Sequence, residues 1–322
     1  MTVLFNAKPM IIAEIGSNFK NFQEAKDSIA FAKMSGADAV KFQLFTKKDL
    51  FGVEADYIID YEMSLDWIPK LKEKADACGI ELMCSAFSPE LYDFVNQYVE
   101  VHKIASSELT YPQILEKVKS FGKPILLSVG GSNKGDIEQA MKILRGGPQV
   151  VLMYCVGAYP SVQYNLFAMQ DLKETFSVPV GLSDHSPCVS YPALSATHHF
   201  GAVAIEKHVN FTKECTPDSG HSLSHNEFTF MCEMLRGKRD CRSFNPMPEE
   251  RDMFLRHNRR LIATKDIQPG EPFKFGDNYG CYRSLKDDAK GIIGFAWEEV
   301  ERSSGAKQFV KAGDGISAED FL

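Results

Sequence analysis

Short apolar runs alternate with amphipathic stretches from residue 9 to about residue 237. Each run is mostly β-branched or apolar, and the stretch after it repeats apolar residues every three or four positions and often ends in glycine. Strands that alternate with helices in this way are typical of a parallel sheet covered by helices. Eight runs are present, at 9–16, 37–43, 81–87, 101–108, 124–130, 150–156, 179–185 and 202–209.

Eight units are the number that closes a barrel, and about 250 residues are typical of a (β/α)₈ barrel. An open, doubly wound sheet is the competing topology. Its dinucleotide-binding form carries a G-x-G-x-x-G loop after the first strand, and no such loop follows AEIG at 13–16. We therefore predict an α/β fold in which residues 1–240 form a (β/α)₈ TIM barrel.

The pattern changes in the last quarter of the chain. Residues 241–260 are polar, contain two prolines and are predicted to be a linker. Residues 261–322 hold short apolar runs broken by PG, GD and AGDG turns, which predicts a small, mainly β domain. A domain of about 60 residues has a limited core, so we expect it to pack against the barrel or a partner chain.

Composition narrows the class of protein. A net charge of −7 disfavours a nucleic-acid-binding role. The N-terminal residues lack the pattern of a signal peptide, and no apolar stretch approaches the ~20 residues that span a bilayer. The eight cysteines are scattered without a C-x-x-C pair, as in proteins of a reducing compartment. We therefore predict a cytoplasmic protein with no nucleic-acid or membrane partner.

Polar residues gather at the C-terminal ends of the predicted strands, which is where barrel enzymes carry their chemistry. Polar strand ends are common, but lysines, carboxylates and two histidines together are unusual in an acidic protein. The barrel predicts that these side chains meet at one mouth. They are Glu14, Lys41, Gln43, Ser85, Lys103, Ser106, Glu108, Ser128, Ser183, Asp184, His185, Glu206 and His208.

The two histidines end consecutive strands, which places them about 5 Å apart along the sheet. A lone histidine at a strand end is usually structural, but His185 and His208 as neighbours can share a divalent ion. Two histidines without cysteine argue against a structural zinc site. We predict an open octahedral site for Mn²⁺ or Mg²⁺. No such positional argument applies to His198, His199, His221 or His225. The first two are expected at the surface or edge of a helix.

Lys41 and Lys103 are predicted to form a cationic cup with the strand-end serines. Lysine as a point charge, together with short hydroxyl donors, suits a phosphate or a carboxylate. A lysine at a barrel strand end is also a candidate for a Schiff base, so a pyruvate aldolase stays a possible alternative at this point.

The order of several short motifs resembles the sialic acid synthase family, also called the N-acylneuraminate or nonulosonate synthases. The resemblance covers nearly the whole chain. In the tail, ATKDIQPGE at 263–271 and the Tyr282-Arg283 pair resemble that family's antifreeze-like, or SAF, domain. The motifs in the barrel are AEIGSN (13–18), GADAVKFQ (36–43), HKIASSEL (102–109), GKPILLS (122–128), AYP (158–160), GLSDHS (181–186), IEKH (205–208) and TPDSGHSL (216–223).

The resemblance implies a reaction in which phosphoenolpyruvate condenses with an open-chain N-acyl mannosamine-type sugar, giving a nine-carbon 2-keto acid and phosphate. It implies a divalent metal, commonly Mn²⁺, on His185 and His208. It also implies that Arg283 of one subunit enters the partner's barrel, which makes a domain-swapped homodimer. The residues matching phosphoenolpyruvate-binding positions are Lys41, Ser85, Lys103, Ser106, Ser128 and Ser183, and those matching sugar contacts are Glu14, Gln43, Tyr159 and Asp218.

The chemistry of these residues agrees with that reaction. A metal on the histidine pair polarises the aldehyde as a Lewis acid, so His185 is a candidate catalytic residue with Lys41, which holds the anion. Positive charge then develops at C2 of phosphoenolpyruvate. Glu108, which matches a carboxylate proposed to handle water, can stabilise that charge and activate the water that adds there.

The sequence departs from the family pattern at three positions. Phe19 stands where a histidine is usual, Gly157 where an asparagine is usual, and Val129 where a threonine is usual. We expect Phe19 and Gly157 to remove polar groups near the two substrates, so the sugar could be a legionaminic- or pseudaminic-type precursor. The same departures keep a third hypothesis open, a non-catalytic sugar-binding protein of the same fold.

Overall fold

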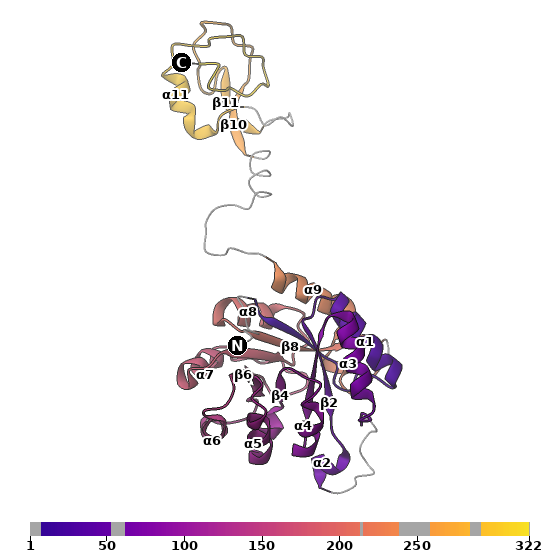
Figure 1. Cartoon of the computed structure of the whole chain (residues 1–322). Helices are drawn as coiled ribbons and strands as arrows, with labels where there is room; N and C mark the ends of the chain where they lie inside the picture. Colours follow the sequence, from indigo (N-terminus) through magenta and orange to yellow (C-terminus); the bar gives the residue numbers. More distant parts are fainter. Residues whose placement is uncertain (1–7, 53–61, 213–214, 238–257, 284–290, 322) are drawn as a thin grey trace. The chain divides into compact units, whose positions relative to one another are not determined.

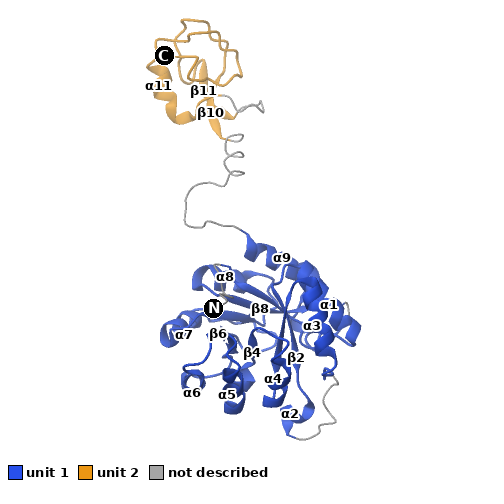
Figure 2. Cartoon of the chain, viewed as in Figure 1, with its two compact units in different colours: residues 1–237 blue, residues 238–322 orange. Residues whose placement is uncertain are grey.

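The computed structural model describes residues 8–52, 62–212, 215–237, 258–283 and 291–321. The chain divides into two compact units, Met1–Gly237 and Lys238–Leu322 (Figure 2). Most of the predicted linker 241–260 lies outside the described residues. The last residues of that range are described, and strand β10 begins among them at Arg259, two residues before the predicted start of the second domain.

The first unit is a closed parallel barrel, and the predicted (β/α)₈ fold is confirmed. Each strand pairs in parallel with the next along the chain, and β1 also pairs with β8, which closes the ring. All eight predicted strands are present. The strands are β1 (Met10–Glu14), β2 (Ala39–Leu44), β3 (Glu81–Ala86), β4 (His102–Ile104), β5 (Ile125–Ser128), β6 (Val150–Tyr154), β7 (Val180–Asp184) and β8 (Ala204–Asn210).

The fourth strand differs most from its predicted length. The sequence pattern extends it to residue 108, whereas β4 ends at Ile104 and a 3₁₀ turn, η1 (Ser106–Glu108), follows. The turn carries Ser106 and Glu108 out of the alternation of the strand. Their positions relative to the barrel mouth are therefore set by the turn.

Helices lie outside the ring of strands (Figure 1). Several begin at a side chain that caps their first turn; the Asn21 side chain, for example, accepts a hydrogen bond from the backbone N–H of Glu24. After β8, a 3₁₀ turn, η2 (Ser219–His221), and the short strand β9 (Leu223–Ser224) lead to the last helix of this unit. The helices are α1 (Phe22–Met34), α2 (Lys47–Phe51), α3 (Trp67–Cys78), α4 (Pro89–Val95), α5 (Pro112–Ser120), α6 (Lys134–Leu144), α7 (Ala168–Phe176), α8 (Tyr191–Phe200) and α9 (His225–Arg236).

Alternation along each strand sorts its side chains into two environments. On β2, Val40 and Phe42 join the large core between strands and helices, while Ala39 joins the smaller core inside the barrel. Lys41 and Gln43 share the inward face with Ala39 and line the pocket above it. The inner core closes the barrel below that pocket. It consists of Met10, Ile12, Ala39, Met83, Val101, Leu126, Val151, Met153 and Ala204.

The second unit has its own small core. Strands β10 (Arg259–Ala263) and β11 (Tyr279–Arg283) pair antiparallel, and a 3₁₀ turn, η3 (Gly294–Ala296), leads into α11 (Trp297–Glu301). Its buried residues include Leu261, Ile267, Phe273, Tyr279, Val300 and Ile316. Its assignment as an antifreeze-like domain stays a prediction. Within the described residues of either unit, no helix is both long and apolar enough to cross a membrane.

The outward face of β7 and β8 carries a fully buried ion pair. Lys207 Nζ lies 2.9 Å from Asp184 Oδ2, and both side chains are 0% exposed. The other carboxylate oxygen, Asp184 Oδ1, accepts hydrogen bonds from the Tyr164 hydroxyl at 2.8 Å and the Ser186 N–H at 2.9 Å. The prediction that Asp184 reaches the barrel mouth is therefore wrong, because its side chain points away from the pocket to a structural partner.

Replacing Lys207 by methionine leaves Asp184 charged and without its cation in a dry site. We expect a loss of about 3–5 kcal/mol in the free energy of unfolding, measured by urea titration followed by circular dichroism. The exposed pair of Lys72 and Asp76 provides the control, since Lys72→Met should cost about 0–1 kcal/mol. Equal costs for the two variants would contradict a structural role for the buried pair.

Candidate active site

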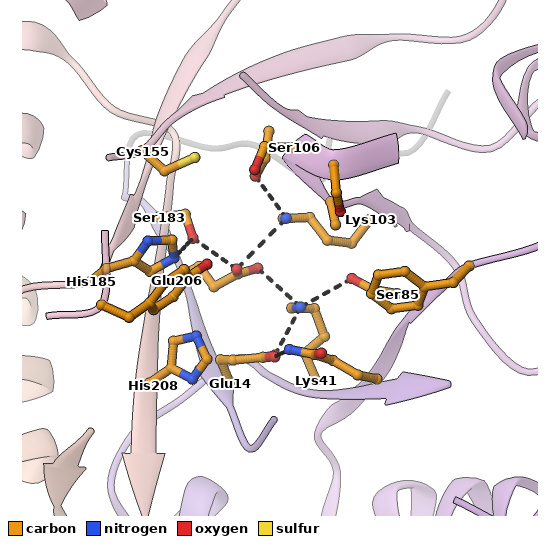
Figure 3. Close-up of a pocket in the computed structure, with 16 residues that line it drawn as sticks. Glu14, Lys41, Ser85, Lys103, Ser106, Cys155, Ser183, His185, Glu206 and His208 are labelled. Carbon is orange, nitrogen blue, oxygen red and sulfur yellow. Dashed lines mark hydrogen bonds and ion pairs between the residues drawn. The ribbon is translucent and has the colours of Figure 1, made fainter. Parts of the chain in front are cut away.

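The C-terminal end of the barrel holds a cavity of about 200 Å³ (Figure 3). Most residues predicted from strand ends line it. It is formed by Glu14, Lys41, Gln43, Ser85, Phe87, Lys103, Ala105, Ser106, Ser107, Ser128, Cys155, Tyr159, Ser183, His185, Glu206 and His208.

Lys41 lies on the floor of the cavity beside two carboxylates. Its Nζ is 2.8 Å from Glu14 Oε2 and 3.8 Å from Glu206 Oε2, and it donates to the Ser85 hydroxyl at 3.1 Å. Gln43 donates to Glu14 Oε1 at 2.7 Å. Burial would lower the pKa of Lys41, but Glu14 and Glu206 raise it above its usual value. Lys41 is therefore a fixed positive charge.

Lys103 has a poorer set of partners. It donates to the Ser128 hydroxyl at 2.8 Å and lies 3.7 Å from Glu206 Oε1. Burial lowers the pKa of Lys103, and Glu206 offsets only part of that effect. The two lysines at the same cavity thus differ in how readily they lose a proton.

Glu206 connects the two lysines. Burial alone would raise the pKa of Glu206, but Lys103 and Lys41 outweigh it and the pKa is lowered. The Ser183 hydroxyl donates to Glu206 Oε1 at 2.9 Å, while Glu206 Oε2 is buried without a hydrogen bond. The Glu206 carboxylate stabilises the positive charges of Lys41 and Lys103. Its contacts with them are long, so a bound anion can replace them.

The predicted histidine pair is present at the cavity wall. The ring centroids of His185 and His208 are 5.6 Å apart. His185 Nδ1 lies 2.8 Å from the carbonyl oxygen of Val156, to which it donates, so Nε2 carries the lone pair and faces the Ser183 hydroxyl at 3.3 Å. Burial lowers the pKa of both imidazoles. Both are therefore held neutral, the form that binds metals.

A third imidazole lies against His208. The ring centroids of His208 and His221 are 4.5 Å apart, and His221 Nε2 is 3.9 Å from Asp218 Oδ1. Tyr159 lies among the histidines, stacked on His185 at 4.3 Å and edge-on to His221 at 4.8 Å. Tyr159 is 55% exposed and covers the histidine side of the cavity.

Besides Asp184, two predicted residues of the first unit do not line the cavity. Asp218 lies next to it, 3.8 Å from His208 Nδ1 through its Oδ2 atom. Glu108 is half-buried on η1, where burial raises its pKa, and its neighbours Ser106 and Ser107 line the cavity instead. Arg283 ends β11 in the second unit and is exposed.

Sequence reasoning missed the roles of two residues. Glu206 was visible at a strand end but received no role, although its position between two predicted cations was a usable signal. His221 lies on η2, away from any strand end, and its place in the TPDSGHSL motif at 216–223 was a usable signal. The prediction for His198 and His199 is confirmed, since both are exposed on α8.

The expectation for Phe19 is wrong. Its ring is buried and packs against Phe42 and Trp67, with centroids 6.2 and 6.0 Å away, and it does not line the cavity. Phe19 therefore contributes to core packing where the family usually has a polar residue, and it leaves the lysines and serines of the cavity unchanged. Val129 is also a buried core residue, whereas a side chain at Gly157 would point into open space.

Comparison with known proteins identifies the family of this chain. The NeuB family model matches residues 28–242. This chain belongs to the NeuB family. The resemblance to the sialic acid synthase family is therefore confirmed, and relatives named as synthases match nearly the full length of the chain.

Two relatives of this NeuB-family chain are similar over most of both sequences. The N,N'-diacetyllegionaminic acid synthase of Campylobacter jejuni is 32% identical and covers 91% of this chain and 94% of its own. The pseudaminic acid synthase of Helicobacter pylori is 32% identical and covers 97% and 98%. A crystal structure of the N-acetylneuraminic acid synthetase of Leptospira borgpetersenii superposes with a TM-score of 0.67 at 27% identity, covering 77% of this chain and 91% of that one.

Gly16 has no room for a side chain beside the site. A Cβ there would lie 2.1 Å from Asp218 Oδ2, which accepts a hydrogen bond from the Ser17 N–H at 2.7 Å, and the backbone has φ +53°. We expect Gly16→Ala to cost about 1–2 kcal/mol of backbone strain and about 1–3 kcal/mol more from displacing Asp218. Gly79→Ala is the matched control, because Gly79 has φ +64° with nothing within 4 Å. Urea titration of both variants measures the difference, and equal losses would contradict the close approach.

Proposed function

We propose that the protein is a nonulosonic acid synthase that condenses phosphoenolpyruvate with an open-chain N-acyl mannosamine-type sugar, giving a nine-carbon 2-keto acid and phosphate. The observation that carries the proposal is a cavity in which two buried lysines with serine hydroxyls lie beside a pair of neutral histidines. The named activities of the relatives agree with this class of product.

The lysine side of the cavity suits phosphoenolpyruvate. The phosphate and carboxylate of phosphoenolpyruvate together carry about two to three negative charges. Hydrogen bonds from lysine and hydroxyl donors are the usual way to bind such groups. Lys41 and Lys103 supply the charges, and Ser85, Ser128 and Ser183 supply hydroxyls within hydrogen-bonding reach of the same cluster. The loose contacts of 3.7 and 3.8 Å to Glu206 are ones that a bound phosphate can replace.

The histidine side fits a divalent ion, Mn²⁺ or Mg²⁺. Both imidazoles are neutral, His185 Nε2 faces the cavity, and His208 Nδ1 is buried without a hydrogen bond. An ion held by His185 and His208 supplies Lewis-acid polarisation of the sugar aldehyde.

The chain's own residues bind and orient the substrates. Lys41 and Lys103 fix the phosphoenolpyruvate so that its enol carbon faces the histidine side of the cavity. Tyr159 excludes water from above, which strengthens the charges below it. Glu108 is our candidate for activating the water that adds at C2; it lies on the turn whose Ser106 and Ser107 line the cavity, and its raised pKa suits proton transfer.

The sugar is proposed to bind on the Glu14 side. Glu14 with Gln43 offers hydrogen-bonding groups at the floor, and Tyr159 with Asp218 offers them at the rim. We further propose that Arg283 reaches the sugar's acyl group from the partner subunit of a domain-swapped homodimer. Equilibrium sedimentation of the full chain tests for the homodimer. Mixing a variant altered in the barrel with a variant altered at Arg283 tests whether each subunit supplies Arg283 to the other.

Turnover with a panel of sugars tests the function. We expect incubation with phosphoenolpyruvate, Mn²⁺ and a 2-acetamido or 2,4-diacetamido hexose to release phosphate and to give a product of the mass of the nine-carbon 2-keto acid. The reaction should stop with a chelator. Lys41→Met should lower kcat/KM by about a thousandfold or more, whereas Lys72→Met should leave it unchanged.

Other outcomes would favour the alternatives. A pyruvate adduct trapped by borohydride on Lys103, with no effect of chelator, would favour the Schiff-base aldolase. Tight sugar binding without phosphate release from any member of the panel would favour a non-catalytic sugar-binding protein.

The lowered pKa of Lys103 predicts an alkaline loss of anion affinity. As pH rises, Lys103 loses its proton before Lys41 does, so one of two cationic contacts with phosphoenolpyruvate disappears. We expect about a tenfold or greater rise in Kd, measured by calorimetry from pH 7 to 10 without metal. Lys103→Arg keeps its charge throughout and should remove the dependence, while Lys41→Arg should retain it. An unchanged profile in Lys103→Arg would contradict the assignment.

A further inference from the structure

The loop after β8 brings two more metal-ligating side chains to His208. One ligand atom from each of His208, Asp218 and His221 lies within 4.8 Å of the other two. His208 lines the cavity described above and Asp218 lies beside it, but His221 has no role in the proposed chemistry. The position of His221 beside these two residues therefore needs an explanation.

Two ring nitrogens in this cluster have no hydrogen-bond partner among the described residues. They are His208 Nδ1 and His221 Nε2, and their side chains are only 6% and 7% exposed. Buried polar atoms are nearly always paired with protein, water or a ligand. An unpaired nitrogen on each of two touching imidazoles points to something bound between them.

The carboxylate between the rings is too far away to be a hydrogen-bond acceptor for either. Asp218 Oδ2 is 3.8 Å from His208 Nδ1, and Asp218 Oδ1 is 3.9 Å from His221 Nε2, beyond the ~3.2 Å limit of a good hydrogen bond. Ligands about 2.1 Å from a shared ion lie roughly 3 to 4 Å apart. The distances suit donors around an ion better than they suit a directly bonded pair.

The loop is held firmly enough to be a site. Asn18, from the loop after β1, donates to the Ser222 hydroxyl at 2.8 Å and to the carbonyl of Val209 at 3.1 Å, and it accepts from Thr216. The Ser222 hydroxyl donates to the carbonyl of Asp218 at 2.6 Å. Both ends of the segment that carries Asp218 and His221 are thus fixed to the barrel, as supporting groups fix the ligands of metal sites.

We propose that His208, Asp218 and His221 together bind a divalent transition-metal ion, so that the metal centre of this chain includes a set of two histidines and one carboxylate. This deepens the metal requirement of the proposed function and rests on it. It adds His221 and Asp218 to the ligands around His208. Imidazole donors favour Mn²⁺, Co²⁺ or Zn²⁺ over Mg²⁺, which prefers oxygen.

Metal binding to the full chain, measured without substrates, tests the proposal. The free Mn²⁺ signal in electron paramagnetic resonance gives Kd and the number of ions bound. His221→Gln keeps most of the side-chain volume and should raise Kd by about tenfold or more. Asp218→Asn keeps the acceptor for the Ser17 N–H and should do the same. His198→Gln removes an exposed imidazole from α8 and should bind Mn²⁺ as the unaltered chain does.

Thermal unfolding in chelator shows which variants are folded before metal is added. If either variant folds and binds Mn²⁺ with unchanged Kd and stoichiometry, the proposal is overturned. A preference for Mg²⁺ over Mn²⁺ in the unaltered chain also overturns it. Because binding is the readout, the result stands apart from the proposed function: weakened binding in both variants supports the site even where no sugar of the panel is turned over.

Discussion

Glu206 lies between two buried lysines at the centre of the barrel, and the arrangement of the site depends on that contact. Two buried ammonium groups beside one another repel. Glu206, at 3.8 Å from Lys41 and 3.7 Å from Lys103, lies between them, and Glu14, at 2.8 Å from Lys41, adds a second carboxylate. Ser183 orients that carboxylate and also faces His185 Nε2. The anion-binding and metal-binding sides of the cavity are therefore connected through one serine and one glutamate.

The packing beneath this cluster explains why it sits at one end of the barrel. Inward-facing positions at the N-terminal end of the strands are apolar and fill the interior, so charge is confined to the last inward position or two of each strand. The outward face uses charge differently. Lys207 pairs with Asp184 on the outward face of the strands. Of three consecutive residues of β8, Glu206 and His208 therefore face the cavity and Lys207 faces away from it.

Much of this was predictable from local pattern. Strand periodicity fixes which residues share a face, so the eight strands and the inward lysines, serines and histidines followed from the sequence. The errors occurred where that period breaks or where partner elements matter. The chain turns in η1 after Ile104, which keeps Ser106 and Ser107 on the cavity lining but not Glu108. Phe19 packs with Phe42 and Trp67, a contact that no local pattern contains.

By itself the sequence determined the barrel, the two-unit organisation of its pattern and the strand-end residues, because spacing along a strand is a local property. Only the tertiary structure decided that Asp184 belongs to Lys207, that Glu206 bridges two lysines and that His221 lies against His208. These pairings join residues from different strands or from a loop whose path is set by distant contacts, such as those of Asn18 with Val209 and Ser222. Contacts of that kind depend on how the barrel closes, and closure is a property of the whole chain.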